Sequence, residues 1–264
     1  MNEKVLLILA DGMRSDSVAA CGHPFAEEFR KKCSYTYNAQ TVSPSVTLPC
    51  HMSLVCSVDP SRHGILTNIW APQVRPIDGI FECVRSAGKT TALYYSWGPL
   101  RNIAQVSSVS LSYCFSSDAD ERYGDERWRR ANEKAVENAI RMLQEEEPDF
   151  MFLYLSSPDE QGHRVGWMTP EYLEAVHDCW RFTEQVLHSL PQGYTTILTA
   201  DHGGHERMHG TEEKEDMTIP LFLHGPRFTP EKELFDVSIK DIAPTIAELL
   251  GVKGDPAWEG KSLL

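Results

Sequence analysis

The sequence predicts an α/β fold, a three-layer α/β/α sandwich with a mostly parallel central sheet. Three short runs rich in apolar and β-branched residues, at 5–10, 149–155 and 195–199, are nearly continuous rather than alternating, as is typical of strands buried on both faces of a parallel sheet. Helical patterns separate these runs, and β-α-β alternation favours helices on both faces. With 264 residues, of which 41% are hydrophobic, we expect one domain over residues 1–264.

The charge balance limits the class of partner. The chain carries 25 Lys and Arg against 38 Asp and Glu, a formal net charge of −13, which would repel a nucleic-acid polymer over most of the surface. Any anionic substrate would need local cations, and bound metal ions could supply them.

Neither the first residues nor the cysteines indicate export. The apolar run before Asp11 is too short for the core of a signal peptide or for a bilayer span. The seven cysteines include no CxxC pair, which favours reduced thiols that act as small packing residues. We therefore expect a cytoplasmic protein without a membrane partner.

The first strand, residues 5–10, ends at Asp11 and Gly12. Ligands bind at the carboxyl ends of strands in open α/β sheets, so Asp11 is a candidate metal ligand. A cap or a turn is its alternative role.

Residues 39–68 hold a candidate nucleophile. Proline-rich extended chain precedes HMSLVC, which has helical spacing, so Thr47 lies at or just before a helix N-terminus. The backbone N–H groups and the helix dipole there favour negative charge, such as an alkoxide or a phosphoryl group. Thr47 could instead be an ordinary N-cap. Asn68 could donate to a substrate oxygen or close a turn, and His63 fits a turn or a supporting role better than that of a ligand.

A helix over 76–87 and a strand over 90–95 continue the alternation. Residues 96–123 have weak periodicity, and we expect a long loop, a small lid or a hairpin insertion there. A charged helix over 125–147 leads into the strand at 149–155.

Asp159 and His163 follow that strand at once and are four residues apart in SSPDEQGHRVGW. We expect a loop here, with Gly162 giving it room to turn both side chains toward one point. A carboxylate and an imidazole at a strand end indicate a metal site.

A helix from 170 to about 190 comes next, and then the strand at 195–199 stops at Asp201 and His202. His205 and His209 follow in the same loop. Carboxylates and imidazoles suit Zn²⁺ or Mn²⁺. A strand at 218–224 and a helix at 239–250 complete the chain.

Together these motifs resemble the alkaline phosphatase superfamily and, within it, the type I phosphodiesterase/nucleotide pyrophosphatase branch. The similar segments are ILADGMRSD, SVTLPCHMSLVCSVDPSRHGILTN, SSPDEQGHRVG, TADHGGHERMHGT with the later DMTIPLFLHGP, and DIAPTIAELLG. They occur in the family's order and cover nearly the whole chain.

The resemblance implies a site for two divalent metal ions, with Zn²⁺ preferred and Mn²⁺ or Fe as alternatives. The ligands of one ion would be Asp11, Asp201 and His202, and those of the other Asp159, His163 and His209.

The resemblance also implies that Thr47 bridges both ions as the nucleophile and that Asn68 binds a non-bridging phosphate oxygen. His205 could replace His209 as a ligand, although the strand that follows His209 matches the family better. The implied reaction is hydrolysis of a small phosphodiester or nucleotide pyrophosphate through a phospho-threonine.

Three features of the sequence bear on which substrate the protein could hydrolyse. The chain is short, and only residues 96–123 could form a cap. The sequence SPSVT lacks the arginine of the sulfatase motif, and no arginine near Thr47 suits the second charge of a monoester. The alternatives are a phosphomonoesterase or sulfatase-like hydrolase of the same fold and, from another class, a metal-binding protein without catalysis.

Overall fold

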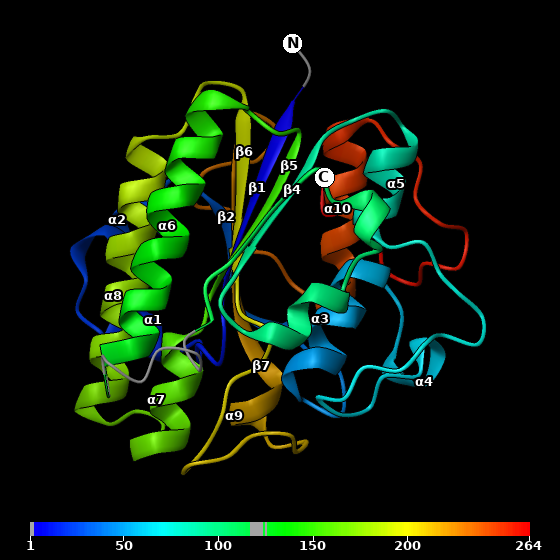
Figure 1. The fold of residues 1–264 in the computed structure, drawn as a ribbon. Coiled ribbons are helices and arrows are strands. Elements are labelled where there is room, and N and C mark those ends of the chain that lie inside the picture. Colours follow the sequence, from blue (N-terminus) through cyan, green and yellow to red (C-terminus); the bar gives the residue numbers. More distant parts are fainter. Residues whose placement is uncertain (1–2, 117–123, 125) are drawn as a thin grey trace.

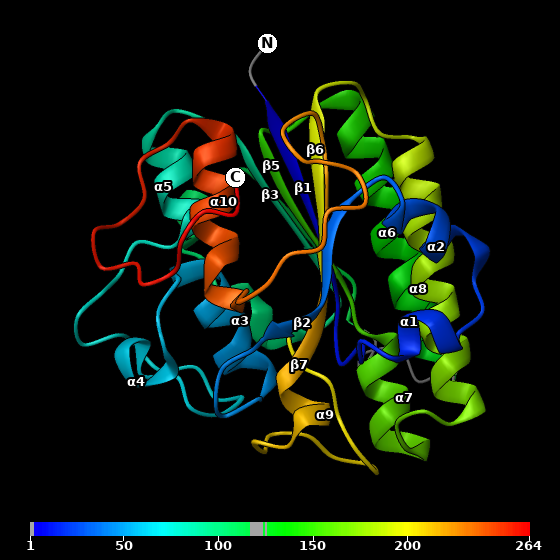
Figure 2. The same ribbon diagram turned by 180° about the vertical axis from the view of Figure 1, so that it is seen from behind.

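The computed structural model describes residues 3–116, 124 and 126–264 and has three layers. Within these ranges a seven-stranded sheet has the order β2-β7-β6-β1-β5-β3-β4. Helices α1, α2, α6, α7 and α8 cover one face, and α3, α4, α5 and α10 cover the other (Figures 1 and 2). The strands are β1 (Lys4–Ala10), β2 (Ser34–Gln40), β3 (Thr91–Tyr95), β4 (Leu111–Cys114), β5 (Phe150–Leu155), β6 (Tyr194–Thr199) and β7 (Thr218–His224).

The helices are mostly short on the α3 face and long on the α8 face. Their bounds are α1 (Ser17–Ala20), α2 (Pro24–Arg30), α3 (Thr47–Cys56), α4 (Pro60–His63), α5 (Ile80–Ser86), α6 (Arg127–Glu145), α7 (Ser157–Val165), α8 (Pro170–His188), α9 (Lys214–Met217) and α10 (Ile242–Leu250). Within the described residues, no helix is long and apolar enough to cross a bilayer.

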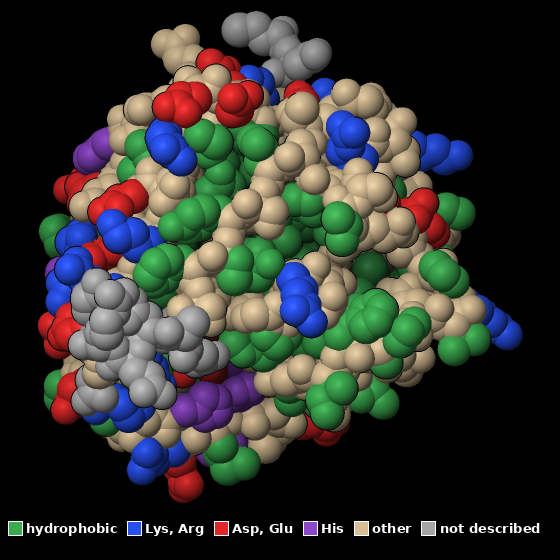
Figure 3. Space-filling view, in the orientation of Figure 1, with side chains coloured by type: hydrophobic (Ala, Val, Ile, Leu, Met, Phe, Trp, Pro, Cys, Tyr) green, Lys and Arg blue, Asp and Glu red, His purple; other side chains and the backbone are tan. Residues whose placement is uncertain are grey.

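Parallel pairing brings the predicted strand ends together. β1 lies between β5 and β6 and is parallel to both, and β7 is antiparallel to β6 and β2. Figure 3 shows histidine side chains gathered near the lower end of the face, where Figure 1 places the carboxyl ends of these strands. The predicted fold class, a three-layer α/β/α sandwich with a mostly parallel sheet, is confirmed.

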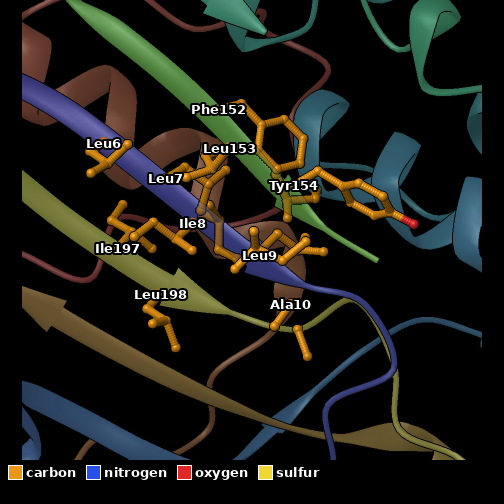
Figure 4. Close-up of a cluster of buried hydrophobic side chains, with 14 of the residues drawn as sticks. Leu6, Leu7, Ile8, Leu9, Ala10, Phe152, Leu153, Tyr154, Ile197 and Leu198 are labelled. Atoms are coloured by element: carbon orange, nitrogen blue, oxygen red, sulfur yellow. The ribbon is translucent and has the colours of Figure 1, made fainter. Parts of the chain in front are cut away.

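The central strands form the core because both of their faces are covered. Val5 to Leu9 are fully buried in β1, as is every residue from Phe150 to Leu153 in β5. Figure 4 shows these side chains leaving the strands in alternation, with Phe152 and Tyr154 on the same side of β5. Each such side chain contributes about 1.5–3 kcal/mol by leaving water, so the strand ends are held by the most stable part of the molecule.

One prediction of local structure was wrong, and one strand was missed. Residues 157–165 form the helix α7 rather than a loop. The strand β2 was missed, and its buried positions include the small polar residues Ser34 and Thr36, which do not give an apolar pattern.

For residues 96–123 the alternatives were a long loop, a small lid or a hairpin insertion, and the structure describes residues 96–116 of this range. Two 3₁₀ turns, Gly98–Asn102 and Val106–Ser108, lead to β4, which pairs with β3 in parallel and so extends the sheet. Residues 117–123 lie outside the described residues.

Candidate active site

Three carboxylates meet at the carboxyl edge of the sheet. Asp11 follows β1, Asp201 follows β6, and Asp159 lies in the first turn of α7 after β5. The backbone N–H of Asp159 donates to the carbonyl of Asp11 (3.0 Å), and the N–H of Gly12 donates to Oδ1 of Asp201 (3.2 Å). These bonds tie the three strand ends into one unit.

Each carboxylate has one buried oxygen without a hydrogen-bond partner among the described residues, namely Oδ1 of Asp11, Oδ1 of Asp159 and Oδ2 of Asp201. Burial, and then the neighbouring carboxylates, raises the pKa of Asp11 and of Asp159 well above the ordinary value. Burial acts the same way on Asp201, but His202 and His51 outweigh it and lower its pKa. Buried anionic oxygens without partners are costly unless a cation binds them, so this donor set fits metal ions.

Three imidazoles present Nε2 to these oxygens because a backbone carbonyl holds each Nδ1. Nδ1 of His202 lies 2.8 Å from the carbonyl of Gly203, Nδ1 of His209 lies 2.8 Å from that of Ser45, and Nδ1 of His163 lies 3.1 Å from that of Arg207. An Nδ1–H that donates to a carbonyl leaves the Nε2 lone pair free for a metal. Burial lowers the pKa of all three, that of His209 to about 4, which keeps them neutral.

The predicted ligands fall into two neighbouring groups. Nε2 of His202 lies 3.4 Å from Asp11 Oδ1 and 3.3 Å from Asp201 Oδ2. Asp159 Oδ1 lies 3.5 Å from Nε2 of His163 and 3.6 Å from Nε2 of His209. His202 is within reach of both groups, since its ligand atom also lies within 4.8 Å of those of Asp159 and His209.

Thr47 is the first residue of α3 and lies against this cluster. Its Oγ1 is 3.1 Å from Nε2 of His202, and the residue is 4% exposed. The alternative role as N-cap is wrong, because Val46 is the N-cap and no side chain caps this helix. Asn68 is at the same helix start, where its Oδ1 accepts a hydrogen bond from the backbone N–H of Leu48 (3.0 Å).

Two supporting residues were missed by the sequence analysis. The hydroxyl of Tyr154 donates to Oδ2 of Asp11. Nδ1 of His51, one turn along α3, lies 2.8 Å from the carbonyl of Thr47 and 3.4 Å from Oδ2 of Asp201. The sequence carried a signal for each: a hydroxyl inside the apolar run of β5, and a histidine four residues after the candidate nucleophile.

An indole joins the loops that carry the ligands. Nε1 of Trp167 donates to the carbonyl of Gly12 (2.9 Å). A Cβ added at Gly162 would lie 2.5 Å from the ring, and one at Gly204 would also overlap it. Gly162 therefore makes room for Trp167 on α7 rather than loosening a loop.

His205 and His63 have hydrogen-bond partners outside the set of candidate metal ligands. Nδ1 of His205 lies 2.7 Å from Oδ1 of Asp216, and Nε2 of His63 lies 3.1 Å from Oγ of Ser53 inside the α3 layer. The suggestion that His205 replaces His209 as a ligand has no support in this geometry.

Comparison with known proteins identifies a family and several relatives. The family model described as type I phosphodiesterase / nucleotide pyrophosphatase matches residues 5–216. Human ectonucleotide pyrophosphatase/phosphodiesterase family member 1 is 24% identical over 217 residues, which cover 75% of this chain and 23% of that protein. The chain thus spans about a quarter of the length of the ectonucleotide relatives that it matches first.

Solved structures share the fold at low identity. Murine ectonucleotide pyrophosphatase/phosphodiesterase 5 has a TM-score of 0.80 at 16% identity and covers 98% of both chains. An inactive variant of that protein, with a threonine replaced by alanine, is known in complex with AMP. A 2-O GAG sulfatase has a TM-score of 0.79 at 15% identity and covers 100% of this chain and 73% of its own.

Proposed function

Because the chain belongs to the type I phosphodiesterase/nucleotide pyrophosphatase family, we propose that it is a two-metal hydrolase of phosphodiester or nucleotide pyrophosphate bonds. One observation carries the proposal: the hydroxyl of Thr47 lies 3.1 Å from Nε2 of His202, beside three buried carboxylate oxygens that have no partner among the described residues. A nucleophile next to a site for cations is what displacement at phosphorus requires.

The proposed ligands are those named from the sequence. Asp11, Asp201 and His202 would hold one ion, and Asp159, His163 and His209 the other, with Thr47 between the two groups. When bound, such ions neutralise phosphoryl charge, lower the pKa of a coordinated hydroxyl and stabilise a leaving oxygen. Zn²⁺ suits imidazole and carboxylate ligands, and Mn²⁺ or Fe would also fit.

The residues of the chain then carry out two displacements. Oγ1 of Thr47 attacks phosphorus, a phospho-threonine forms, and the leaving oxygen departs with its electron pair and takes up a proton. The backbone N–H of Thr47, at the start of α3, and the side-chain amide of Asn68 would donate to the non-bridging oxygens. Water then attacks the same phosphorus, the Thr47–phosphorus bond breaks, and the hydroxyl is restored.

Two observations support a nucleotide or another diester as the substrate. The related murine protein is known in complex with AMP. No Lys or Arg lies between Lys32 and Arg62 in the sequence around Thr47, which supports a substrate without the second charge of a monoester. The likeness to a sulfatase structure keeps sulfate esters as the alternative within this fold.

We also propose a reducing compartment such as the cytoplasm. All seven cysteines are free thiols, and most of them are buried, which supports their role as packing residues.

The test is a substrate panel with metal analysis. Metal-loaded protein should hydrolyse bis-p-nitrophenyl phosphate and a p-nitrophenyl ester of a nucleoside 5′-monophosphate faster than p-nitrophenyl phosphate or p-nitrophenyl sulfate. Thr47→Ala should abolish turnover. A metal-loaded protein that hydrolyses nothing would favour the alternative of a non-catalytic metal-binding protein, and full activity in Thr47→Ala would contradict the mechanism.

A further inference from the structure

Large hydrophobic side chains are exposed in two neighbouring segments of the α3 face. Val74 is 96% exposed, Val106 is 90% exposed, and Ile69 is 77% exposed. With Leu66 and Trp70 they make up most of the large exposed hydrophobic side chains on the described part of the chain. We call this set the apolar loop patch.

Both segments lie on the rim of one pocket. The pocket has a volume of about 360 Å³, and its lining includes Trp70, Pro72 and Ile77 from one segment and Arg101 and Val106 from the other. Figure 3 shows hydrophobic side chains gathered around a Lys or Arg side chain on the part of the face where Figure 1 places α3 and the nearby loops. The two segments therefore meet at this pocket although they come from two parts of the sequence.

The patch is basic in an acidic protein. Residues 60–77 and 96–116 contain no Asp or Glu but carry Arg62, Arg75 and Arg101, whose residues are all exposed. The formal net charge of the whole chain is −13. This combination of exposed apolar groups with cations sets the patch apart from the rest of the surface.

The carboxylates that border the patch are Glu82, Asp59, Asp78, Asp255 and Glu259. Glu82 lines the pocket but is 8% exposed, and its oxygens accept from the backbone N–H groups of Gly79 (3.0 Å) and Gln105 (2.7 Å). Asp59 and Glu259 each lie 2.9 Å from Nζ of Lys240. Asp78, whose backbone N–H donates to Oδ2 of Asp255 (3.1 Å), is an exposed residue at the end of the segment.

We propose that the apolar loop patch docks on the surface of an anionic phospholipid bilayer. Aliphatic side chains and an indole can enter the region between headgroups and acyl chains, and arginines keep their guanidinium groups among the phosphates. An anionic surface attracts these arginines and repels the acidic remainder of the molecule. The charge distribution of the protein therefore favours an anionic lipid and a single orientation of the protein on the bilayer.

Docking in this orientation places the candidate active site near the lipid surface. Asn68 lies between Leu66 and Ile69 in the sequence and accepts from the backbone N–H of Leu48, next to Thr47. The proposal does not depend on catalysis, because it rests on the exposed groups and their charge.

The experiment measures binding to vesicles. The full chain should sediment with vesicles of phosphatidylcholine containing about 30% phosphatidylserine and not with phosphatidylcholine alone. The double variant Ile69→Ser, Val74→Ser should lose about tenfold or more of this binding, and Arg75→Gln and Arg101→Gln should each lose roughly fivefold. Higher salt should weaken binding in the wild type.

Matched controls distinguish docking through the patch from nonspecific adsorption to vesicles. Phe235→Ser removes another exposed hydrophobic side chain, and Lys31→Gln removes an exposed cation at the C-cap of α2; both should bind as the wild type does. Lipids brominated in their acyl chains should quench tryptophan fluorescence in the wild type and not in Trp70→Phe. Circular dichroism and thermal unfolding should show that every variant folds.

Several outcomes would overturn the proposal. They are no binding to the anionic vesicles, equal binding to neutral vesicles, or unchanged binding by the Ile69/Val74 double variant. Sedimentation velocity without lipid provides a further test. If the wild type self-associates and the double variant does not, the patch binds a second copy of the chain and the proposal is overturned.

Discussion

Nδ1 of His205 lies 2.7 Å from Oδ1 of Asp216, and this pair closes the loop that delivers His209 to the candidate active site. Oδ2 of Asp216 accepts from the backbone N–H (2.9 Å) and the hydroxyl (2.8 Å) of Thr211. Because Asp216 is buried and both of its oxygens are bonded, it fixes the chain on both sides of His209. His205 thus supports the loop of the candidate ligand His209.

Asp216→Asn should weaken metal binding without removing a ligand. The amide cannot accept at both former carboxylate oxygens, so the loop would hold His209 less firmly, and we expect metal affinity to fall about 10–100-fold. Competition with a chromophoric chelator measures this affinity. Glu215→Gln, an exposed change on the same short helix, is the control and should bind metal as the wild type does. Equal affinity in both variants would contradict the role of Asp216.

The same pair should contribute to stability over a defined pH range. The hydrogen bond to Asp216 raises the pKa of His205, and the bonds to His205 and Thr211 outweigh burial and lower the pKa of Asp216. The stability that protonated His205 contributes is fully present below its unfolded pKa of about 6.5 and is lost as pH rises through its raised folded pKa. The stability that ionised Asp216 contributes is present above its unfolded pKa of about 3.9 and is lost as pH falls through its lowered folded pKa.

Urea unfolding of the metal-free wild type and Asp216→Asn checks this pH range. The difference in their free energies of unfolding should be largest between about pH 4 and 6.5 and should shrink above that range. A difference that grows toward pH 9 would contradict the assignment.

Removal of a ligand and removal of the nucleophile should have different effects. Asp201→Ala and His163→Ala should lose bound metal and turnover together, whereas Thr47→Ala should lose turnover and keep its metal. His205→Ala should keep most of the metal, since its ring is turned toward Asp216. Metal content by mass spectrometry, measured together with diesterase activity, distinguishes loss of a ligand from loss of the nucleophile. Metal retention in Asp201→Ala would contradict the proposed ligand set.

In the metal-free protein, the free energy of unfolding should depend on pH through the carboxyl group of Asp11. The raised pKa of Asp11 means that the folded metal-free protein holds a proton that the unfolded chain releases above about pH 4. This carboxyl therefore lowers stability as pH rises toward its folded pKa. Bound metal replaces the proton, so stabilisation by metal should increase with pH.

Asp11→Asn isolates this effect in chelator-treated protein. The buried histidines have lowered pKa values and act in the opposite direction, but they act in both proteins, so the difference between wild type and variant reports Asp11. We expect the variant to gain stability relative to the wild type as pH rises from 5 to 8 in urea unfolding. A constant difference would show that Asp11 does not titrate in this way.

Gly162→Ala should destabilise the protein although alanine is the better helix former. In an open helix the change would stabilise by about 1 kcal/mol, but here the new Cβ would lie 2.5 Å from the ring of Trp167. We expect a net loss of about 1–3 kcal/mol and weaker metal binding. Gly98→Ala is the control, because a Cβ at that position meets no atom within 4 Å. Thermal and urea unfolding of both variants check the prediction.

The sequence predicted the carboxylates of the site because parallel pairing aligns strand ends. Once residues 5–10, 149–155 and 195–199 are interpreted as parallel strands, Asp11, Asp159 and Asp201 must lie at one edge of the sheet. Tyr154 and His51 were missed because each lies inside an apolar pattern that describes packing. Their contacts depend on the register between β1 and β5 and on the position of α3.

The apolar loop patch also could not be predicted from the sequence. Its hydrophobic residues come from segments about thirty residues apart and follow no helical or strand period, and the formal charge of the whole chain hides the local excess of arginine. The expectation that no membrane takes part was drawn from the first residues and the cysteines, and neither describes one face of the molecule.

The indole of Trp167 has a consequence for how this protein can vary. It lies against Gly162 and Gly204 and donates to the carbonyl of Gly12, so one ring is shared by the chain segments that follow β1, β5 and β6. A smaller residue at position 167 would leave a void against all three segments, and a larger one at either glycine would displace the ring. We expect these positions to change together or not at all across related sequences, which an alignment of homologues would test.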